Sequence, residues 1–79
     1  MKEQDLIDLG FKRKEGFDFD SNQVFHYYDL DLVEEFSLIS NDSDNTEKGW
    51  RVEFLLFQME FVEKKELKKF INIVKRNTK

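Results

Sequence analysis

His26 is the residue whose side chain could act as a general acid or base near neutral pH. It lies in the run His26-Tyr27-Tyr28, inside a segment with the alternation of a β-strand. Catalysis would also need a nucleophile at a fixed place, and no motif places a serine near His26, while cysteine does not occur in the chain. We therefore interpret His26 as a structural or surface histidine, and we expect that the protein is not an enzyme.

A second group of chemically capable residues lies in and after the polar segment 41–49. Asp42, Asp44, Thr46 and Glu53 are spaced like the ligands of an EF-hand calcium loop. The position that needs a glycine for the sharp turn of such a loop is occupied by Glu47, and the flanking segments have strand patterns, not helix patterns. The sequence favours a polar hairpin loop here, and we expect no metal and no cofactor.

Two further motifs have a functional and a structural interpretation. Trp50-Arg51 could be an exposed binding anchor, but a tryptophan that opens a buried strand is more often part of the core. The cluster Lys64, Lys65, Lys68 and Lys69 could contact phosphates, but it is also typical of the solvated face of a helix. Since the net charge of the chain is −4, direct binding to nucleic acid is disfavoured.

The most unusual stretch runs over residues 15–47, which contain ten carboxylates and no lysine or arginine. Aromatic and β-branched residues alternate with these carboxylates, so the stretch predicts folded β-structure with an acidic surface and not a disordered tail. Asp29 and Asp31 would share one strand face about 7 Å apart, a spacing similar to that of phosphates along a nucleic-acid strand. The predicted partner-binding residues are Tyr27, Asp29, Asp31, Glu34, Glu35, Asp42 and Asp44.

The first half of the chain must fold into elements that position these residues. The patterns of apolar, glycine and turn-forming residues predict where each element lies. In chain order they predict a helix over residues 2–9 ended by Gly10, a solvated turn at Lys12-Arg13-Lys14, a half-buried strand with Phe17 and Phe19, a turn at Ser21-Asn22, and a strand over residues 24–33. In the last of these, Tyr28, Leu30 and Leu32 would face the core, with Tyr27, Asp29 and Asp31 on the opposite face.

The second half of the chain carries the clearest strand and helix signals. The predicted elements are a turn near Glu34-Glu35, a strand over residues 36–40 with Phe36 and Leu38 inward, a hairpin loop over 41–49, a strand from Trp50, a bulge or bend near 55–58, and a helix over 63–76. In that helix, Leu67, Phe70, Ile71 and Val74 form a core-facing stripe. Residues 62–79 hold seven basic and two acidic side chains, so this end of the chain has a charge of +5.

Length and composition limit the class of protein. Seventy-nine residues form a single domain, residues 1–79. The lack of cysteine and of a cationic, apolar N-terminus leads us to expect a cytoplasmic protein, and no apolar run is long enough for a membrane span.

The chain also resembles a group of known proteins. The pattern Asp5-Leu6-Ile7-Asp8-Leu9-Gly10-Phe11, Tyr28-x-Leu30-x-Leu32, Gly49-Trp50-x-Val52 and Glu66-Leu67-x-x-Phe70-Ile71-x-x-Val74 is similar to small proteins of phages and mobile elements, particularly from Bacteroidetes. The resemblance implies an α, β-meander, α fold and a non-enzymatic accessory role, such as that of anti-defence inhibitors or toxin-neutralising immunity proteins. It defines no functional residues.

Together these observations predict an α+β domain: a short N-terminal helix, an antiparallel meander of three or four strands, and a C-terminal amphipathic helix packed on one face of the sheet. The expected function is a small acidic protein-binding module, a phage or mobile-element inhibitor or accessory protein that engages a basic surface of a partner protein. The alternative is a homo-oligomeric structural or assembly protein, in which the acidic sheet of one copy meets the basic helix of another.

Overall fold

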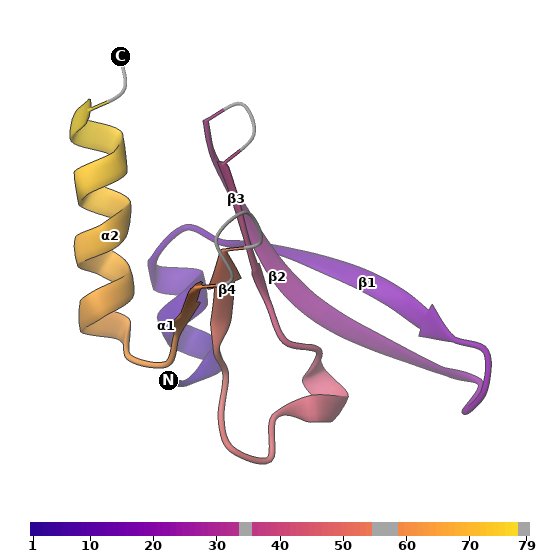
Figure 1. Ribbon diagram of the computed structural model, residues 1–79. Coiled ribbons are helices and arrows are strands. Elements are labelled where there is room, and N and C mark those ends of the chain that lie inside the picture. The colour runs from indigo at the N-terminus through magenta and orange to yellow at the C-terminus, as the bar shows by residue number, and fades with distance from the viewer. Residues whose placement is uncertain (34–35, 55–58, 78–79) are drawn as a thin grey trace.

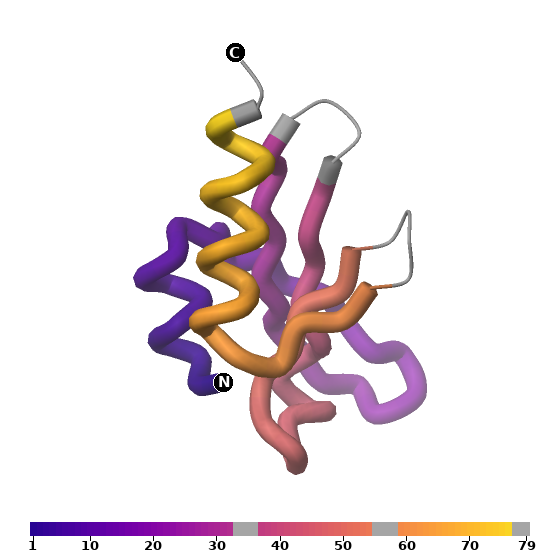
Figure 2. The backbone as a smooth tube through the Cα atoms, turned by 60° about the vertical axis from the view of Figure 1, so that its left-hand side comes forward, coloured from indigo at the N-terminus to yellow at the C-terminus, as the bar shows by residue number. Residues whose placement is uncertain are grey.

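The computed structural model describes residues 1–33, 36–54 and 59–77, and it is an α+β fold with two layers. Five antiparallel strands form one sheet in the order β1-β2-β3-β4-β5, so every strand is paired with its neighbour in the sequence. Both helices lie on the same face of this sheet (Figures 1 and 2). The predicted fold class is confirmed, although the meander has five strands and not three or four.

The chain begins with helix α1, Glu3–Asp8, within the predicted range of residues 2–9. The Lys2 N–H donates a hydrogen bond to Asp5 Oδ2 (2.9 Å), which caps the first turn. At the other end, Gly10 has a φ of +94°. The Gly10 N–H bonds the Ile7 carbonyl and the Phe11 N–H bonds the Leu6 carbonyl. This pair of bonds is a Schellman motif, so the predicted glycine stop is confirmed.

Strand β1, Lys12–Asp18, corrects one expectation. Lys12-Arg13-Lys14 does not form a solvated turn, because these residues are the first three of the strand and pair with Asp29, Tyr28 and Tyr27. A triplet of charged residues resembles a turn in sequence, but an edge strand also tolerates charge because one of its sides stays in water.

Strand β2, Gln23–Val33, is the longest element of the sheet. Tyr28 is buried, Leu30 and Leu32 pack against the core, and Asp31 is exposed, so the predicted division into two faces is confirmed. The turn between β1 and β2 spans residues 19–22 and includes the predicted Ser21-Asn22, with Asn22 at φ +57°.

The sheet continues through β3, Phe36–Ser40, and β4, Val52–Phe54, joined by a loop with a short 3₁₀ turn, η1, Ser43–Asn45. Leu38 faces inward as predicted, whereas the Phe36 side chain is outside the described part of the chain. Strand β5, Met59–Phe61, pairs antiparallel with β4. The predicted bulge or bend at 55–58 lies outside the described residues, and on either side of it the chain runs in opposite directions.

Helix α2, Lys64–Asn77, covers the sheet with the predicted stripe. Leu67 and Ile71 are buried, and Phe70 packs against Phe54 and Phe61 with ring centroids 5.6 and 5.0 Å away. The buried apolar residues form one core between the helices and the sheet: Leu6, Phe11, Tyr28, Leu38, Val52, Phe54, Phe61, Leu67 and Ile71.

Candidate functional site

The face of the sheet that points away from both helices is the candidate site, and we call it the open face. Alternate residues of β2 lie on it, and they include the predicted Tyr27, Asp29 and Asp31. Tyr27 and Asp29 are half-buried and Asp31 is exposed, although no helix covers them. The Phe25 and Tyr27 rings lie 6.4 Å apart on the same face. Aromatic area and carboxylate charge therefore occur together on one rigid strand.

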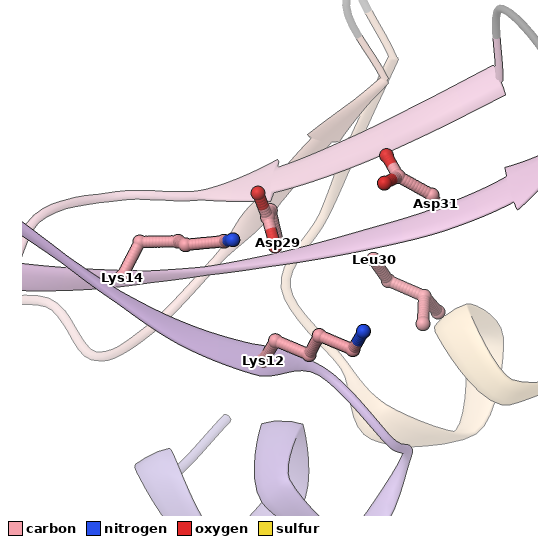
Figure 3. Close-up of a pocket in the computed structure, with 5 residues that line it drawn as sticks. All are labelled: Lys12, Lys14, Asp29, Leu30 and Asp31. Atoms are coloured by element: carbon pink, nitrogen blue, oxygen red, sulfur yellow. The ribbon is translucent and has the colours of Figure 1, made fainter.

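Strand β1 places two lysines beside these carboxylates. Lys12 pairs with Asp29 and Lys14 with Tyr27 in the strand register, so both lysine side chains share the open face. Lys12, Lys14, Asp29, Leu30 and Asp31 line a pocket of about 120 Å³, in which Lys14 points toward Asp29 (Figure 3). The stretch over residues 15–47 is free of cations in sequence, but the fold brings cations to it from the preceding segment.

A row of residues across the whole sheet shows how charge changes along the open face. Lys12, Asp29, Ile39, Glu53 and Glu60 are successive partners in the register of β1 to β5. The row is thus cationic at the β1 edge and anionic at the β5 edge.

Glu53 and Glu60, directly opposite each other, were not among the predicted site residues. Arg51 forms an ion pair with Glu60 (3.4 Å), which offsets part of the repulsion between the two glutamates. Arg51 and Glu53 alternate with buried Val52 and Phe54, and this alternation in the sequence is the signal that places Arg51 and Glu53 on the open face.

Asp42 and Asp44, the predicted site residues of the loop, lie beside a different part of β2. The neighbouring Ser43 Oγ accepts a hydrogen bond from the His26 N–H (3.0 Å), which holds η1 against the strand. Burial raises the pKa of Asp42, and the nearby charge of Asp44 raises it further. These two carboxylates therefore form a second acidic area, separate from Asp29 and Asp31 along the strand.

The remaining predicted site residues, Glu34 and Glu35, lie outside the described residues. Within the described ranges, no three or more histidine or carboxylate side chains are grouped so that they could hold a metal ion. The segment from Asp42, which has the spacing of a calcium loop, forms η1 and the connection to β4. Glu53, the last residue of that spacing, lies in β4 on the open face.

His26 belongs to a polar cluster on the helix side of the sheet. Glu3 Oε2 accepts a hydrogen bond from the Tyr28 hydroxyl (2.7 Å) and lies 2.6 Å from His26 Nε2. The Trp50 ring packs on both neighbours, with centroids 5.7 Å from His26 and 5.5 Å from Tyr28. Trp50 thus lines the core, as the structural interpretation predicts.

The hydrogen bond from Tyr28, followed by that with His26, lowers the pKa of Glu3, so this carboxyl is an anion that fixes α1 to β2. Burial, and then the hydrogen bond with Glu3, raises the pKa of Tyr28. The two shifts describe one contact, in which the Tyr28 phenol keeps its proton and donates a hydrogen bond to the Glu3 carboxylate. Glu3 was not identified from the sequence, because nothing in a six-residue helix indicates which strand residue its side chains meet.

In comparisons with known proteins, no family model, no curated protein and no solved structure matches the chain. The resemblance to phage and mobile-element proteins therefore stays a prediction. Among the described residues, neither helix has the length and apolarity that crossing a bilayer requires.

Proposed function

We propose that the protein is a small, non-enzymatic binding module that engages a basic surface of another protein through the open face of its sheet. The observation that supports this most is the position of both helices on the opposite face, which leaves Phe25, Tyr27, Asp29 and Asp31 uncovered (Figure 1). The ladder of hydrogen bonds holds the strand backbone, so a partner that binds this face would order little of the main chain.

The chemistry of the open face favours a protein with a basic, partly apolar surface as the partner. Tyr27 and Phe25 supply aromatic contact area, and Asp29, Asp31 and Glu53 supply negative charge that steers a cationic surface toward the sheet. Lys12 and Lys14 at the β1 edge would repel part of such a surface. The partner would then bind in one orientation, with its cations toward β2 to β5.

The specific form of the proposal is inhibition. A rigid negative face that occupies a basic cleft prevents the ordinary anionic ligand of that cleft from binding. A small accessory protein of a phage or mobile element could neutralise a host protein in this way. Fold alone does not establish this role, so the test must be of binding.

The test is affinity capture by the immobilised full-length chain from a lysate of the organism that encodes it. A D29K/D31K variant should lose the retained protein, and high salt should weaken retention of that protein by the original chain. The matched control is E63K/E66K, which makes the same change of charge at exposed residues at the start of α2, away from the open face. Equal retention by the original chain and by a folded D29K/D31K variant would reject the proposal.

A further inference from the structure

The outer part of the β1–β2 hairpin, residues 15–25, projects beyond both helices, and we call it the distal hairpin (Figures 1 and 2). Three large apolar side chains on it are exposed: Phe17 by 45%, Phe19 by 88% and Val24 by 66%. Phe17 is the register partner of Val24, and the Phe17 and Phe19 rings are in edge contact with centroids 5.0 Å apart. A grouped apolar surface of this kind is a candidate contact for another molecule.

The charge of the distal hairpin limits what can cover it. Glu15, Asp18 and Asp20 are its only charged residues, which gives a local charge of −3. Asp18 Oδ1 accepts a hydrogen bond from the Asp20 N–H (2.9 Å), and this bond holds the pKa of Asp18 below its usual value. Asp18 lies on the face of the strand opposite Phe17 and Val24, and Asp20 lies in the turn beside Phe19. The tip that carries the apolar cluster is thus negatively charged, which fits a cationic surface and opposes an anionic membrane.

The same chain carries a surface of the opposite charge on α2. Lys65, Lys69 and Arg76 are exposed and lie on the side of the helix opposite buried Leu67 and Ile71, because they follow the helical spacing i, i+4, i+11. We call these three residues the basic stripe.

The charges of the basic stripe are available to a second molecule. Within the described residues, no carboxylate forms an ion pair with any of the three, whereas Lys64 is paired with Asp5 and Asp8 of α1. Exposed Ile73, four residues after Lys69 on the same helix, adds apolar area beside the basic stripe.

We propose that a second copy of the chain covers the distal hairpin, with Phe17, Phe19 and Val24 of one copy packed against α2 of the other. Asp20, in the turn next to Phe19, then faces the basic stripe, and Asp18, on the other side of β1 at the same end of the hairpin, adds to the negative potential there. The distal hairpin and α2 lie on opposite sides of the molecule, so they cannot meet within one copy (Figure 1). This contact leaves the open face uncovered, and it does not depend on the proposed binding to a basic partner.

The first test is sedimentation velocity of the full chain over a range of concentrations at low and high salt. Self-association should appear at low salt and weaken at high salt, since the contact pairs exposed charges. An F17S/F19S variant should associate on the order of tenfold more weakly, because truncating central apolar contacts costs more than about 1.4 kcal/mol. The matched control D29N/D31N, on the open face, should associate as the original chain does.

The decisive experiment exchanges the charges of the two surfaces. D18K/D20K and K65E/K69E should each lose self-association alone. An equal mixture of the two should restore it, because the cationic hairpin tip of one copy is then attracted to the anionic helix of the other. All the exchanged residues except Asp18 are exposed and Asp18 is half-buried, so circular dichroism should confirm the fold of each variant. A chain that stays monomeric at every concentration, or variants that associate unchanged, would overturn the proposal. A D29K/D31K variant that loses partner capture but still self-associates would support the proposal of self-association.

Discussion

The base and the tip of the β1–β2 hairpin follow the same alternation of side chains but differ in what covers them. At the base, Tyr28 faces the helices and is 3% exposed. At the tip, Val24 lies on the same side of the same strand and is 66% exposed, because neither helix extends over it. Strand periodicity therefore specifies the face on which a side chain lies, whereas burial depends on the length and position of another element.

The base and the tip of the hairpin also differ in the contacts that hold them. The base is fixed by the cluster of Glu3, His26, Tyr28 and Trp50, which connects α1, β2 and the segment just before β4. The distal hairpin is held instead by an apolar contact, in which the Phe25 ring lies over Gly16. A Cβ on residue 16 would collide with that ring. We expect substitutions at the base to change stability and those at the tip to change association.

The largest effect is expected from Leu67→Ala, which removes a fully buried side chain between α2 and the sheet. The cavity should lower the free energy of unfolding by about 2–5 kcal/mol, a large share of the stability of so small a domain. Urea denaturation followed by circular dichroism measures this. Asn72→Ala, on the exposed side of the same helix, is the control, and an equal effect of the two would contradict the packing described for the base.

A smaller effect is expected from Gly10→Ala, where the backbone has a φ of +94° and a Cβ would meet no atom within 4 Å. The cost is therefore one of backbone conformation alone, about 1–2 kcal/mol. The same denaturation experiment checks it. Gly10→Asn, which tolerates positive φ better, should recover part of the loss, and if it does not, the Schellman motif is not the source of the effect.

Glu3→Gln should cost about 1–2 kcal/mol through loss of charge-assisted hydrogen bonds to Tyr28 and His26, with Glu47→Gln as an exposed control. Since the pKa of Glu3 is lowered from its ordinary value of 4.5, the unfolded chain binds this proton more tightly than the folded one. The contribution of Glu3 is complete above pH 4.5 and is lost as the pH falls through the lower pKa of the folded state. The Gln variant should therefore lose less stability than the original chain on acidification, and parallel pH curves would disprove the role of Glu3.

The smallest effect on stability is expected from Phe19→Ser at the tip. Its side chain is 88% exposed, so unfolding should change by no more than about 0.5 kcal/mol. Denaturation in dilute solution, where copies do not associate, measures the effect of the substitution on the isolated fold. A loss comparable with that of Leu67→Ala would mean that the tip is packed within its own copy.

Much of the fold follows from local pattern. Gly10 identifies the end of α1, the spacing of Leu67 and Ile71 gives the buried side of α2, and alternation divides β2 into two faces. The strand at Lys12-Arg13-Lys14 could not be predicted in this way, because its stability comes from pairing with β2 and not from its own residue types.

The candidate site was predictable only in part, for a related reason. Tyr27, Asp29 and Asp31 share a face because they are two residues apart, and the sequence shows this directly. The neighbours that modify their charge, Lys12, Lys14 and Glu53, come from other strands, and only the register places them. Charge along a chain is therefore a poor measure of charge across a sheet.

The strand order β1-β2-β3-β4-β5 also has a kinetic consequence. Every pairing joins neighbours in the sequence, so each ladder closes a short loop and costs little chain entropy before its contacts form. Several contacts between distant parts of the chain involve its two ends, such as the bond from the Trp50 N–H to the Met1 carbonyl and the packing of α2 on the sheet. We infer that the meander can assemble from successive hairpins, and that the docking of the two helices completes the native state.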